Sequence, residues 1–288
     1  MIKLVVSDMD GTLLNEKSEI SKKNCKAIQS LGKKGISFAI ASGRDYHGVY
    51  SIIHQYDLHC EAILGNGAQY VDENGQLVMS CYMNKDVVED VVKIFVKQNI
   101  PVMIFTTKGF YTPYVPEYVR NAFIERGMKR FGSLREEYEK DGKYAHVPCN
   151  QLVHIDDFKT FLNQDIDIIK VEAFSLDPSL IQDKNIQDAL KVIPTISYLS
   201  SFDDNVEVTD QNAQKGLILE KVIQQKGLKK EEVAVMGDGM NDLTMFERFP
   251  YGFAPANAEK VIQDLAYQVV DDCENDGVAK AIELILKI

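Results

Sequence analysis

The chain has 288 residues, 45% of them hydrophobic, which is enough apolar material for one large core or two smaller ones. It carries 43 acidic and 32 basic residues, a formal net charge of −11, and no block of Lys and Arg, so we expect no nucleic-acid partner. No apolar run is long enough for a signal peptide or a membrane span, and the five scattered cysteines follow no zinc or disulfide spacing. We therefore expect a soluble, cytoplasmic two-domain protein that does not contact a membrane.

The first third of the chain alternates short apolar runs with helical periodicity. The expected strands are residues 2–6, 36–41 and 62–64. Each ends at a polar turn, and these turns are Asp8-Met9-Asp10, Ser42-Gly43-Arg44 and Gly65-Asn66-Gly67. Ser21 is a plausible N-cap for a helix that ends near Gly35. This β-α-β-α-β order predicts an α/β fold with a parallel sheet and right-handed crossovers.

From about Asn84 the pattern changes to that of an α+β domain. Two β-rich runs meet at Lys108-Gly109, which predicts an antiparallel hairpin. A helix that carries Val88, Val91, Val92 and Phe95 is expected before this hairpin. After it we expect helices at 117–126, 158–163 and 181–192 and strands at 168–174, 196–199 and 205–209. After Asp210 the βα rhythm resumes, with a strand at 233–236 and later helices around Val261 and Ile282. We expect a domain of residues 84–211 inserted into a core of residues 1–83 and 212–288.

The turn after the first strand is the first candidate for chemistry. In open α/β sheets, ligands bind outside the carboxyl ends of the strands. Asp8 and Asp10 can face the same small volume there, a geometry suited to one nucleophile and one proton-transfer group. Gly11 lets the backbone approach a ligand, and the amides of Gly11 and Thr12 can bind phosphoryl oxygens. For these residues alone, the alternative is an Asx-type turn that caps a strand.

A second acidic turn follows the strand at 233–236. Asp238 and Asp242 lie four residues apart in it, and Gly237 and Gly239 permit unusual backbone angles. Carboxylates placed in this way are suited to bind a hard cation.

Mg²⁺ prefers a few carboxylate oxygens together with water and phosphate oxygens. We therefore expect Asp8, the backbone carbonyl of Asp10 and Asp238 to form a partial shell for this cation. Asn241 and Asp242 are expected to complete or support that shell. The alternative for the second turn is that it only caps a helix beginning near Asn241.

A lysine and a serine complete the set. Lys215 precedes Gly216 at the start of a predicted helix, where a lysine runs against the usual preference for acids. Its ammonium group can neutralise a phosphoryl group. Ser42, followed by Gly43, can donate its hydroxyl to the same phosphoryl oxygens. Taken alone, each has a simpler explanation, a solvated surface lysine and an ordinary N-cap.

Together these segments resemble the four signature motifs of the haloacid dehalogenase superfamily of phosphohydrolases, in the family's order. The segments are Asp8-Met9-Asp10-Gly11-Thr12, Ser42-Gly43-Arg44, Lys215-Gly216 and Gly237-Asp238-Gly239-Met240-Asn241-Asp242. The inserted domain resembles the large α+β cap, of C2B type, of the Cof-like subgroup. The resemblance therefore covers the whole chain and implies a Rossmann-like, three-layer core with a parallel sheet.

The resemblance also implies roles for individual residues. It makes Asp8 the nucleophile and Asp10 the acid/base, and it places Asp8, Asp10 and Asp238 around Mg²⁺ with Asp242 in support. It assigns Ser42, its neighbour Gly43 and Lys215 to the phosphoryl group. Arg44 and Asn66 look like features of the subgroup, expected to face either the substrate or the hinge of the cap.

The predicted function is a Mg²⁺-dependent phosphomonoester hydrolase that acts on a small phosphorylated metabolite, such as a sugar phosphate, through an aspartyl phosphate. One alternative is a sugar phosphomutase or phosphotransferase, which passes the phosphoryl group to a hydroxyl instead of water. Another is a phosphoaspartate signalling receiver without enzymatic activity. Asp10 argues against a receiver, because it supplies a proton shuttle that a receiver lacks.

Overall fold

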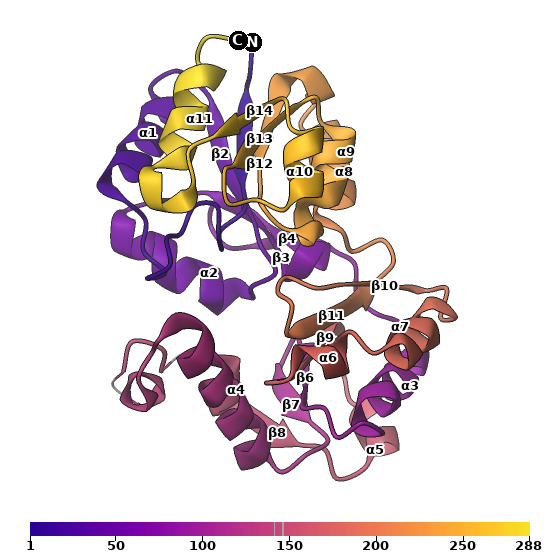
Figure 1. The fold of residues 1–288 in the computed structure, drawn as a ribbon. Helices are drawn as coiled ribbons and strands as arrows, with labels where there is room; N and C mark the ends of the chain where they lie inside the picture. The colour runs from indigo at the N-terminus through magenta and orange to yellow at the C-terminus, as the bar shows by residue number, and fades with distance from the viewer. Residues whose placement is uncertain (141, 146) are drawn as a thin grey trace. The chain divides into compact units, whose positions relative to one another are not determined.

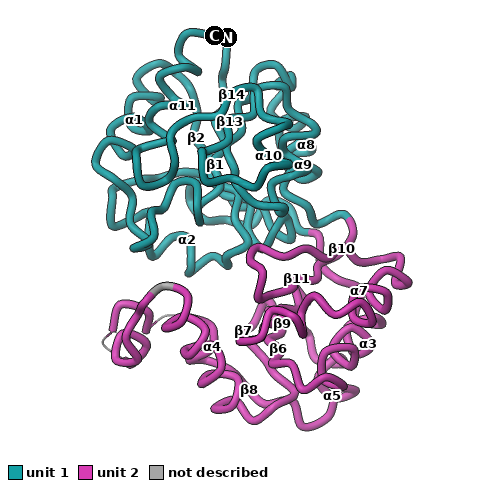
Figure 2. The backbone as a smooth tube through the Cα atoms, in the orientation of Figure 1, with its two compact units in different colours: residues 1–80, 212–288 teal, residues 81–211 magenta. Residues whose placement is uncertain are grey.

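The computed structural model describes residues 1–140, 142–145 and 147–288, which form two compact units (Figure 2). Unit 1 consists of Met1–Ser80 and Asn212–Ile288, and unit 2 consists of Cys81–Gln211. The inserted unit thus begins at Cys81, whereas the expected boundary was residue 84. Within the described ranges, no helix has the length and apolarity needed to cross a membrane.

Unit 1 is built on an eight-stranded sheet with the order β14-β13-β12-β1-β2-β3-β4-β5 (Figure 1). Its strands are β1 (Leu4–Ser7), β2 (Ser37–Ala41), β3 (Glu61–Leu64), β4 (Gln69–Val71), β5 (Leu77–Ser80), β12 (Val233–Met236), β13 (Tyr251–Pro255) and β14 (Gln268–Val270). The strands from β14 to β3 pair in parallel, and β4 and β5 add an antiparallel edge. The expected α/β fold with a parallel core sheet is confirmed.

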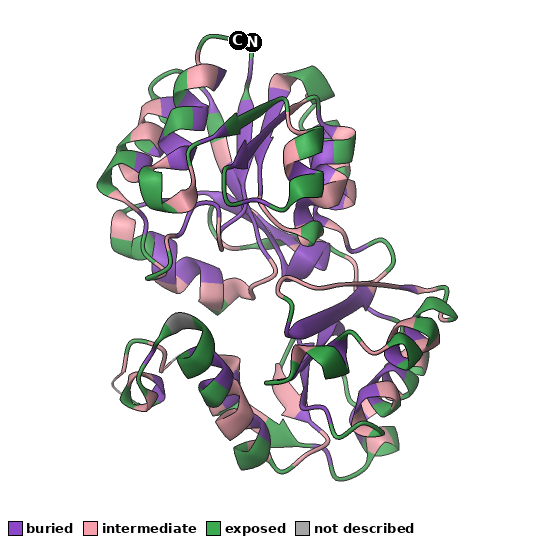
Figure 3. Ribbon diagram, viewed as in Figure 1, coloured by how far each residue is buried: buried purple, intermediate pink, exposed green. Residues whose placement is uncertain are grey.

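Helices cover both faces of this sheet (Figure 1). They are α1 (Lys22–Gly32), α2 (Tyr46–Ile53), α8 (Lys215–Gln225), α9 (Leu243–Arg248), α10 (Lys260–Leu265) and α11 (Gly277–Ile285). Apolar side chains of α1, α2 and α11 share one core cluster with the sheet, whereas α9 and α10 contribute to a separate cluster. Burial is accordingly concentrated in the strands and the inner faces of the helices (Figure 3). The sheet and the helices on its two faces therefore form three layers.

Unit 2 contains a six-stranded sheet with the order β10-β11-β9-β6-β7-β8. Its elements are α3 (Lys85–Val96), β6 (Val102–Thr106), β7 (Gly109–Thr112), α4 (Pro116–Phe131), β8 (Leu152–His154), α5 (Phe158–Leu162), β9 (Ile168–Phe174), α6 (Pro178–Ile181), α7 (Lys184–Lys191), β10 (Ile196–Leu199) and β11 (Asn205–Asp210). Neighbouring strands are antiparallel except β7 and β8, which are parallel. The predicted hairpin is confirmed, because Thr106 pairs with Gly109 across its turn. Side chains of α3, α5 and α7 pack with the sheet in one apolar core.

Local signals explain where the expected elements occur and where they differ. The Ser21 cap is confirmed, since its hydroxyl accepts the Asn24 N–H at 3.1 Å, but α1 ends at Gly32 and not near Gly35. The helix expected at 181–192 is present as α7, but it begins at Lys184, because Asp183 caps its start by accepting the Asn185 N–H at 2.7 Å. The short helix α6, which ends at Ile181, was not expected.

Asp276 links the start of α11 to the start of α1. Its carboxylate accepts a hydrogen bond from the Ser21 hydroxyl and pairs with Lys23 Nζ at 2.8 Å. The bond from Lys23, and then that from Ser21, hold the pKa of Asp276 below its usual value of 3.8. The carboxylate is therefore favoured in its ionised form when the protein is folded.

Replacing Asp276 by asparagine should lower the free energy of unfolding by about 0.5 to 1 kcal/mol at pH 7. Asparagine tolerates the φ of +62° at this position, so only the charge is removed. A lowered folded-state pKa stabilises above the unfolded pKa of an aspartate, and that contribution is lost as pH falls through the folded value. Urea unfolding at pH 7 and at about pH 3 should show the difference shrinking at acid pH. An equal difference at both would contradict a charge effect.

Candidate active site

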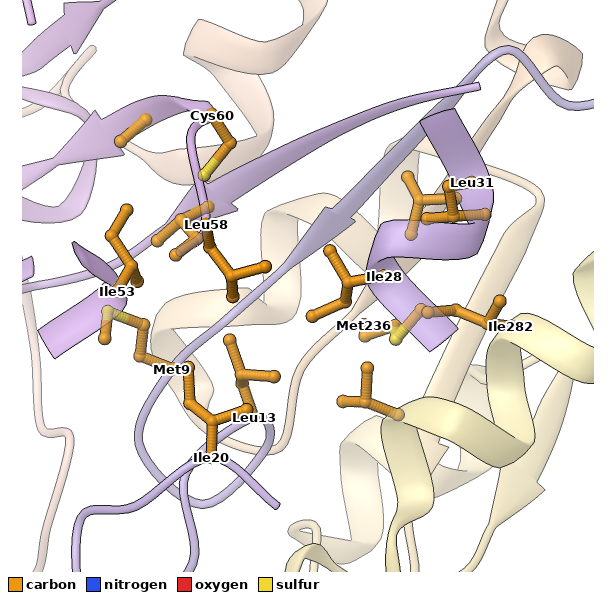
Figure 4. Close-up of a cluster of buried hydrophobic side chains, with 14 of the residues drawn as sticks. Met9, Leu13, Ile20, Ile28, Leu31, Ile53, Leu58, Cys60, Met236 and Ile282 are labelled. Atoms are coloured by element: carbon orange, nitrogen blue, oxygen red, sulfur yellow. The ribbon is translucent and has the colours of Figure 1, made fainter. Parts of the chain in front are cut away.

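The polar turns after β1, β2 and β12 meet at one edge of the core sheet. β1 pairs with β12 on one side and with β2 on the other, so Ser7 lies beside both Met236 and Ile40. Met9 is fully buried in the apolar core (Figure 4). It separates Asp8, which is 4% exposed, from Asp10, whose side chain is 38% exposed. The core side chain of Met9 thus anchors the turn that carries both carboxylates.

Lys215 joins two of the carboxylates. Its Nζ lies 2.6 Å from Asp8 Oδ1 and 2.7 Å from Asp242 Oδ1, and its side chain is fully buried. Burial alone lowers the pKa of Lys215, but the two carboxylates outweigh this effect and raise it above its usual value. A Cβ on Gly216 would lie 2.1 Å from the Thr244 carbonyl, so only glycine lets α8 start this close to α9. The Lys215-Gly216 pair therefore places an ammonium ion inside the site.

The turn after β12 is folded around Asp242. Its Oδ2 accepts the backbone N–H groups of Asp238 at 2.9 Å and Gly239 at 3.1 Å, while its Oδ1 binds Lys215. A Cβ on Gly237 would lie 2.4 Å from the carboxyl carbon of Asp242, so this approach requires glycine. Both oxygens of Asp242 hold neighbouring groups in place, which fits the supporting role expected from the sequence.

Asp238 is held beside the turn that contains Gly11. The hydroxyl of Thr12 donates to Asp238 Oδ1 at 2.7 Å. Gly11 has a φ of +77°, and a Cβ there would lie 2.3 Å from Asp238 Oδ2. The Thr12 N–H donates to the Met9 carbonyl at 3.3 Å. Asp10 and Leu14 form an isolated parallel bridge, which directs the Gly11 N–H toward the Leu14 carbonyl. Both amides expected to bind phosphoryl oxygens are therefore engaged within the turn.

The carboxylates of this cluster form a site that can hold a metal ion. Asp8, Asp238 and Asp242 each offer an oxygen within 4.8 Å of the others. When ionised, the three face the single ammonium of Lys215, which leaves an excess of two negative charges. Burial raises the pKa of Asp8 well above its usual value, although the ammonium of Lys215 opposes this effect. Burial, followed by the charge of Asp242, raises the pKa of Asp238 to about 7. A hard divalent cation prefers such oxygens and would balance the charge.

Arg44 binds Asp10 through two parallel hydrogen bonds. Arg44 Nε donates to Asp10 Oδ2 at 2.8 Å, and Nη2 donates to Oδ1 at 2.7 Å. Burial lowers the pKa of this guanidinium, but the nearby carboxylates, Asp10 first, raise it above its usual value. The pairing of Arg44 with Asp10 was not expected from the sequence. It depends on β1 and β2 being neighbours, and the spacing in the chain does not report strand order.

Ser42, Gly43, Asn66 and Asn241 complete the set. Ser42 is buried, and its oxygen accepts the Arg44 N–H at 3.2 Å, with Gly43 between the two residues. Asn66 is also buried and has a φ of +59°. It donates its N–H to the Ser42 carbonyl at 3.0 Å and accepts from Asn241 Nδ2 at 3.3 Å. The structure thus places Asn66 against Ser42 and Asn241 within unit 1.

Replacing Arg44 by alanine should lower kcat about 100-fold, because Asp10 would lose the two bonds that orient it for the proton transfer expected from the sequence. Lysine can form only one of the two bonds, so Arg44→Lys should fall between wild type and Arg44→Ala. Steady-state kinetics with one phosphate ester would measure both values. Equal kcat for all three proteins would show that the pair does not serve the reaction.

Comparison with known protein families shows which family the chain belongs to. The family model of the haloacid dehalogenase-like hydrolases matches residues 5–282 of this chain. The chain therefore belongs to the haloacid dehalogenase-like hydrolase family.

Individual relatives narrow the class. Phosphatase YwpJ of Bacillus subtilis is 27% identical, and the match covers 99% of this chain and 100% of the relative. The 5-amino-6-(5-phospho-D-ribitylamino)uracil phosphatase YcsE of the same species is 26% identical, with 98% and 94% covered. A solved haloacid dehalogenase-like hydrolase from B. subtilis has a TM-score of 0.84 at 26% identity, with 98% of this chain and 99% of that chain covered. The protein is a phosphatase of the Cof-like subgroup, and unit 2 is its cap.

Proposed function

We propose that this protein is a Mg²⁺-dependent phosphomonoesterase that releases phosphate from a small phosphorylated metabolite through an aspartyl phosphate on Asp8. The observation that carries the proposal is the pairing of the two carboxylates of one turn with different cations. Asp8 is held by Lys215 in a buried cluster, and Asp10 is held by Arg44 in a more exposed position. Two carboxylates in such different surroundings are suited to different chemical tasks.

In the first step, a carboxylate oxygen of Asp8 attacks phosphorus while the bond to the ester oxygen breaks. Asp10 donates a proton to that oxygen, so the leaving group departs as an alcohol. Lys215 offsets charge on the phosphoryl oxygens. The Ser42 oxygen accepts from Arg44, which directs its own hydroxyl hydrogen toward another acceptor such as a phosphoryl oxygen.

In the second step, Asp10 takes a proton from a water molecule that attacks the phosphorus of the aspartyl phosphate. The bond between phosphorus and Asp8 breaks, which releases phosphate and restores the carboxylate. Arg44 orients Asp10 for this step through its two hydrogen bonds. The proton that Asp10 takes from water is the one that it donates to the leaving group in the next cycle.

The donor set of the site fits Mg²⁺, because it consists of carboxylate oxygens with an excess of negative charge. Asp8 and Asp238, together with the backbone carbonyl of Asp10, are the groups that would hold it, and Asp242 would orient them. Bound there, Mg²⁺ supplies positive charge that reduces repulsion between the Asp8 carboxylate and a phosphate dianion.

The proposal is tested by a screen of phosphorylated metabolites with Mg²⁺, with release of inorganic phosphate as the readout. The panel should contain sugar phosphates, nucleotides, flavin and pyridoxal phosphates, and the phosphoribitylamino uracil for which YcsE is named. We expect release by the wild-type protein, no release by Asp8→Ala, and loss of release with EDTA that Mg²⁺ restores.

Three other outcomes would contradict the proposed phosphatase function. Conversion of one sugar phosphate into its isomer without release would indicate a phosphomutase. A phosphoprotein that persists for many minutes without turnover would indicate a receiver. Equal release by wild type and Asp8→Ala would exclude Asp8 as the nucleophile.

A further inference from the structure

The turn that follows β13 contacts both of the loops that form the site. Asn257 Nδ2 donates to the Gly11 carbonyl at 2.8 Å, and Asn257 Oδ1 accepts the Cys273 N–H at 3.0 Å. Two residues further on, the Glu259 N–H donates to the Asp238 carbonyl at 2.9 Å. One short segment therefore holds the backbone of Gly11 and that of Asp238.

The partners of Asn257 determine the orientation of its amide. The carbonyl of Gly11 only accepts, and the N–H of Cys273 only donates, so Nδ2 must face Gly11 and Oδ1 must face Cys273. An aspartate at this position would keep the acceptor for Cys273 but lose the donor for Gly11. The two contacts can therefore be separated by substitution.

The bond to Gly11 controls a whole peptide plane. The Gly11 carbonyl and the Thr12 N–H belong to the same rigid peptide unit. Asn257 holds the carbonyl end, and the Met9 carbonyl holds the N–H end at 3.3 Å. The φ of +77° at Gly11 belongs to a residue with wide conformational freedom, so without the bond from Asn257 this plane can rotate.

Rotation of that plane would disturb the residue that holds Asp238. The Thr12 hydroxyl, which donates to Asp238 Oδ1 at 2.7 Å, belongs to the residue directly after the plane. We propose that Asn257 is a positioning residue for phosphoryl transfer, which fixes the Gly11–Thr12 peptide and thereby the position of Asp238. This inference rests on the proposed phosphatase function.

The test compares Asn257→Asp and Asn257→Ala with the wild type. We expect kcat/KM for one phosphate ester to fall about tenfold in both variants, since small displacements of catalytic groups are costly. Inhibition by orthovanadate, which mimics the phosphoryl group in transfer, should weaken by a similar factor. The Asn257 side chain is exposed, so the melting temperature should stay within a few degrees of the wild-type value.

Asn275→Ala is the matched control, because among the described residues Asn275 hydrogen-bonds only to Asp272, in the loop that carries Cys273. It should retain wild-type kinetics. Wild-type kcat/KM and vanadate inhibition in Asn257→Asp would overturn the proposal, as would activity lost only in proportion to unfolded protein. If the wild-type protein neither releases phosphate nor binds vanadate, that result contradicts the proposed phosphatase function and not the role of Asn257 alone.

Discussion

The Asp8→Asn protein is expected to lose turnover by about 10⁴-fold or more, because an amide cannot form the covalent intermediate. Its fold should remain intact. Asparagine has the same shape, and its oxygen can still accept from Lys215 Nζ, which lies 2.6 Å from the present carboxylate oxygen. The substitution also removes the cost of burying a charge here, because burial is the main cause of the raised pKa of Asp8. Loss of activity without loss of stability is the expected signature of a nucleophile.

Initial rates of phosphate release with Mg²⁺ would measure this effect. Acid quenching during turnover should trap a hydroxylamine-sensitive phosphoprotein in the wild type and none in the variant. Asp57→Asn is a matched control, since Asp57 is an exposed aspartate of unit 1 with a φ of +54° that asparagine tolerates. Asp8→Ala guards against deamidation of the new asparagine. Turnover retained by Asp8→Ala would exclude the covalent mechanism.

Replacing Lys215 by methionine is expected to affect stability and catalysis together. The buried carboxylates of Asp8 and Asp242 would lose the ammonium between them, and an uncompensated buried charge typically costs about 3 to 5 kcal/mol. Turnover should fall by about 10² to 10³-fold, because the charge that offsets the phosphoryl oxygens is removed. Urea unfolding in EDTA, together with initial rates in Mg²⁺, would measure the two effects separately.

The controls for Lys215→Met lie in the same helix and the same cluster. Lys221 is exposed on α8, so Lys221→Met should stay within about 0.5 kcal/mol of wild type. Adding Asp242→Asn to Lys215→Met removes one of the two buried charges that have lost their partner. The double variant should regain part of the stability but none of the activity. An unfolding free energy unchanged by Lys215→Met would contradict the buried ion pairs of Lys215 with Asp8 and Asp242.

The parts of the fold that local signals encode were predictable. The Ser21 cap and the hairpin at Lys108-Gly109 depend on residues close in the chain, and the buried strand at 233–236 has four consecutive apolar side chains. The short strands β13 and β14 were not predicted. β13 contains a glycine and ends in a proline, and β14 has three residues, so neither shows a clear period.

The candidate site shows the same division. Aspartates and glycines at strand ends indicated the cation cluster, because residue type and position carry that information. The pairing of Arg44 with Asp10 depends on which strands are neighbours, and the contact of Asn257 with Gly11 depends on an unpredicted strand. Contacts across the sheet follow from tertiary packing, which periodicity in one segment does not report.

The interrupted path of the chain through unit 1 also affects how the protein is made. β1 lies between β2 and β12, so the centre of this sheet is incomplete until Met236 has been synthesised. At the usual pace of translation, the delay after β1 lasts about 10 to 50 s. The inserted unit has its own core and can fold as a unit during that time. One edge of β1 therefore stays unpaired during that time, and an unpaired strand edge can pair with other chains.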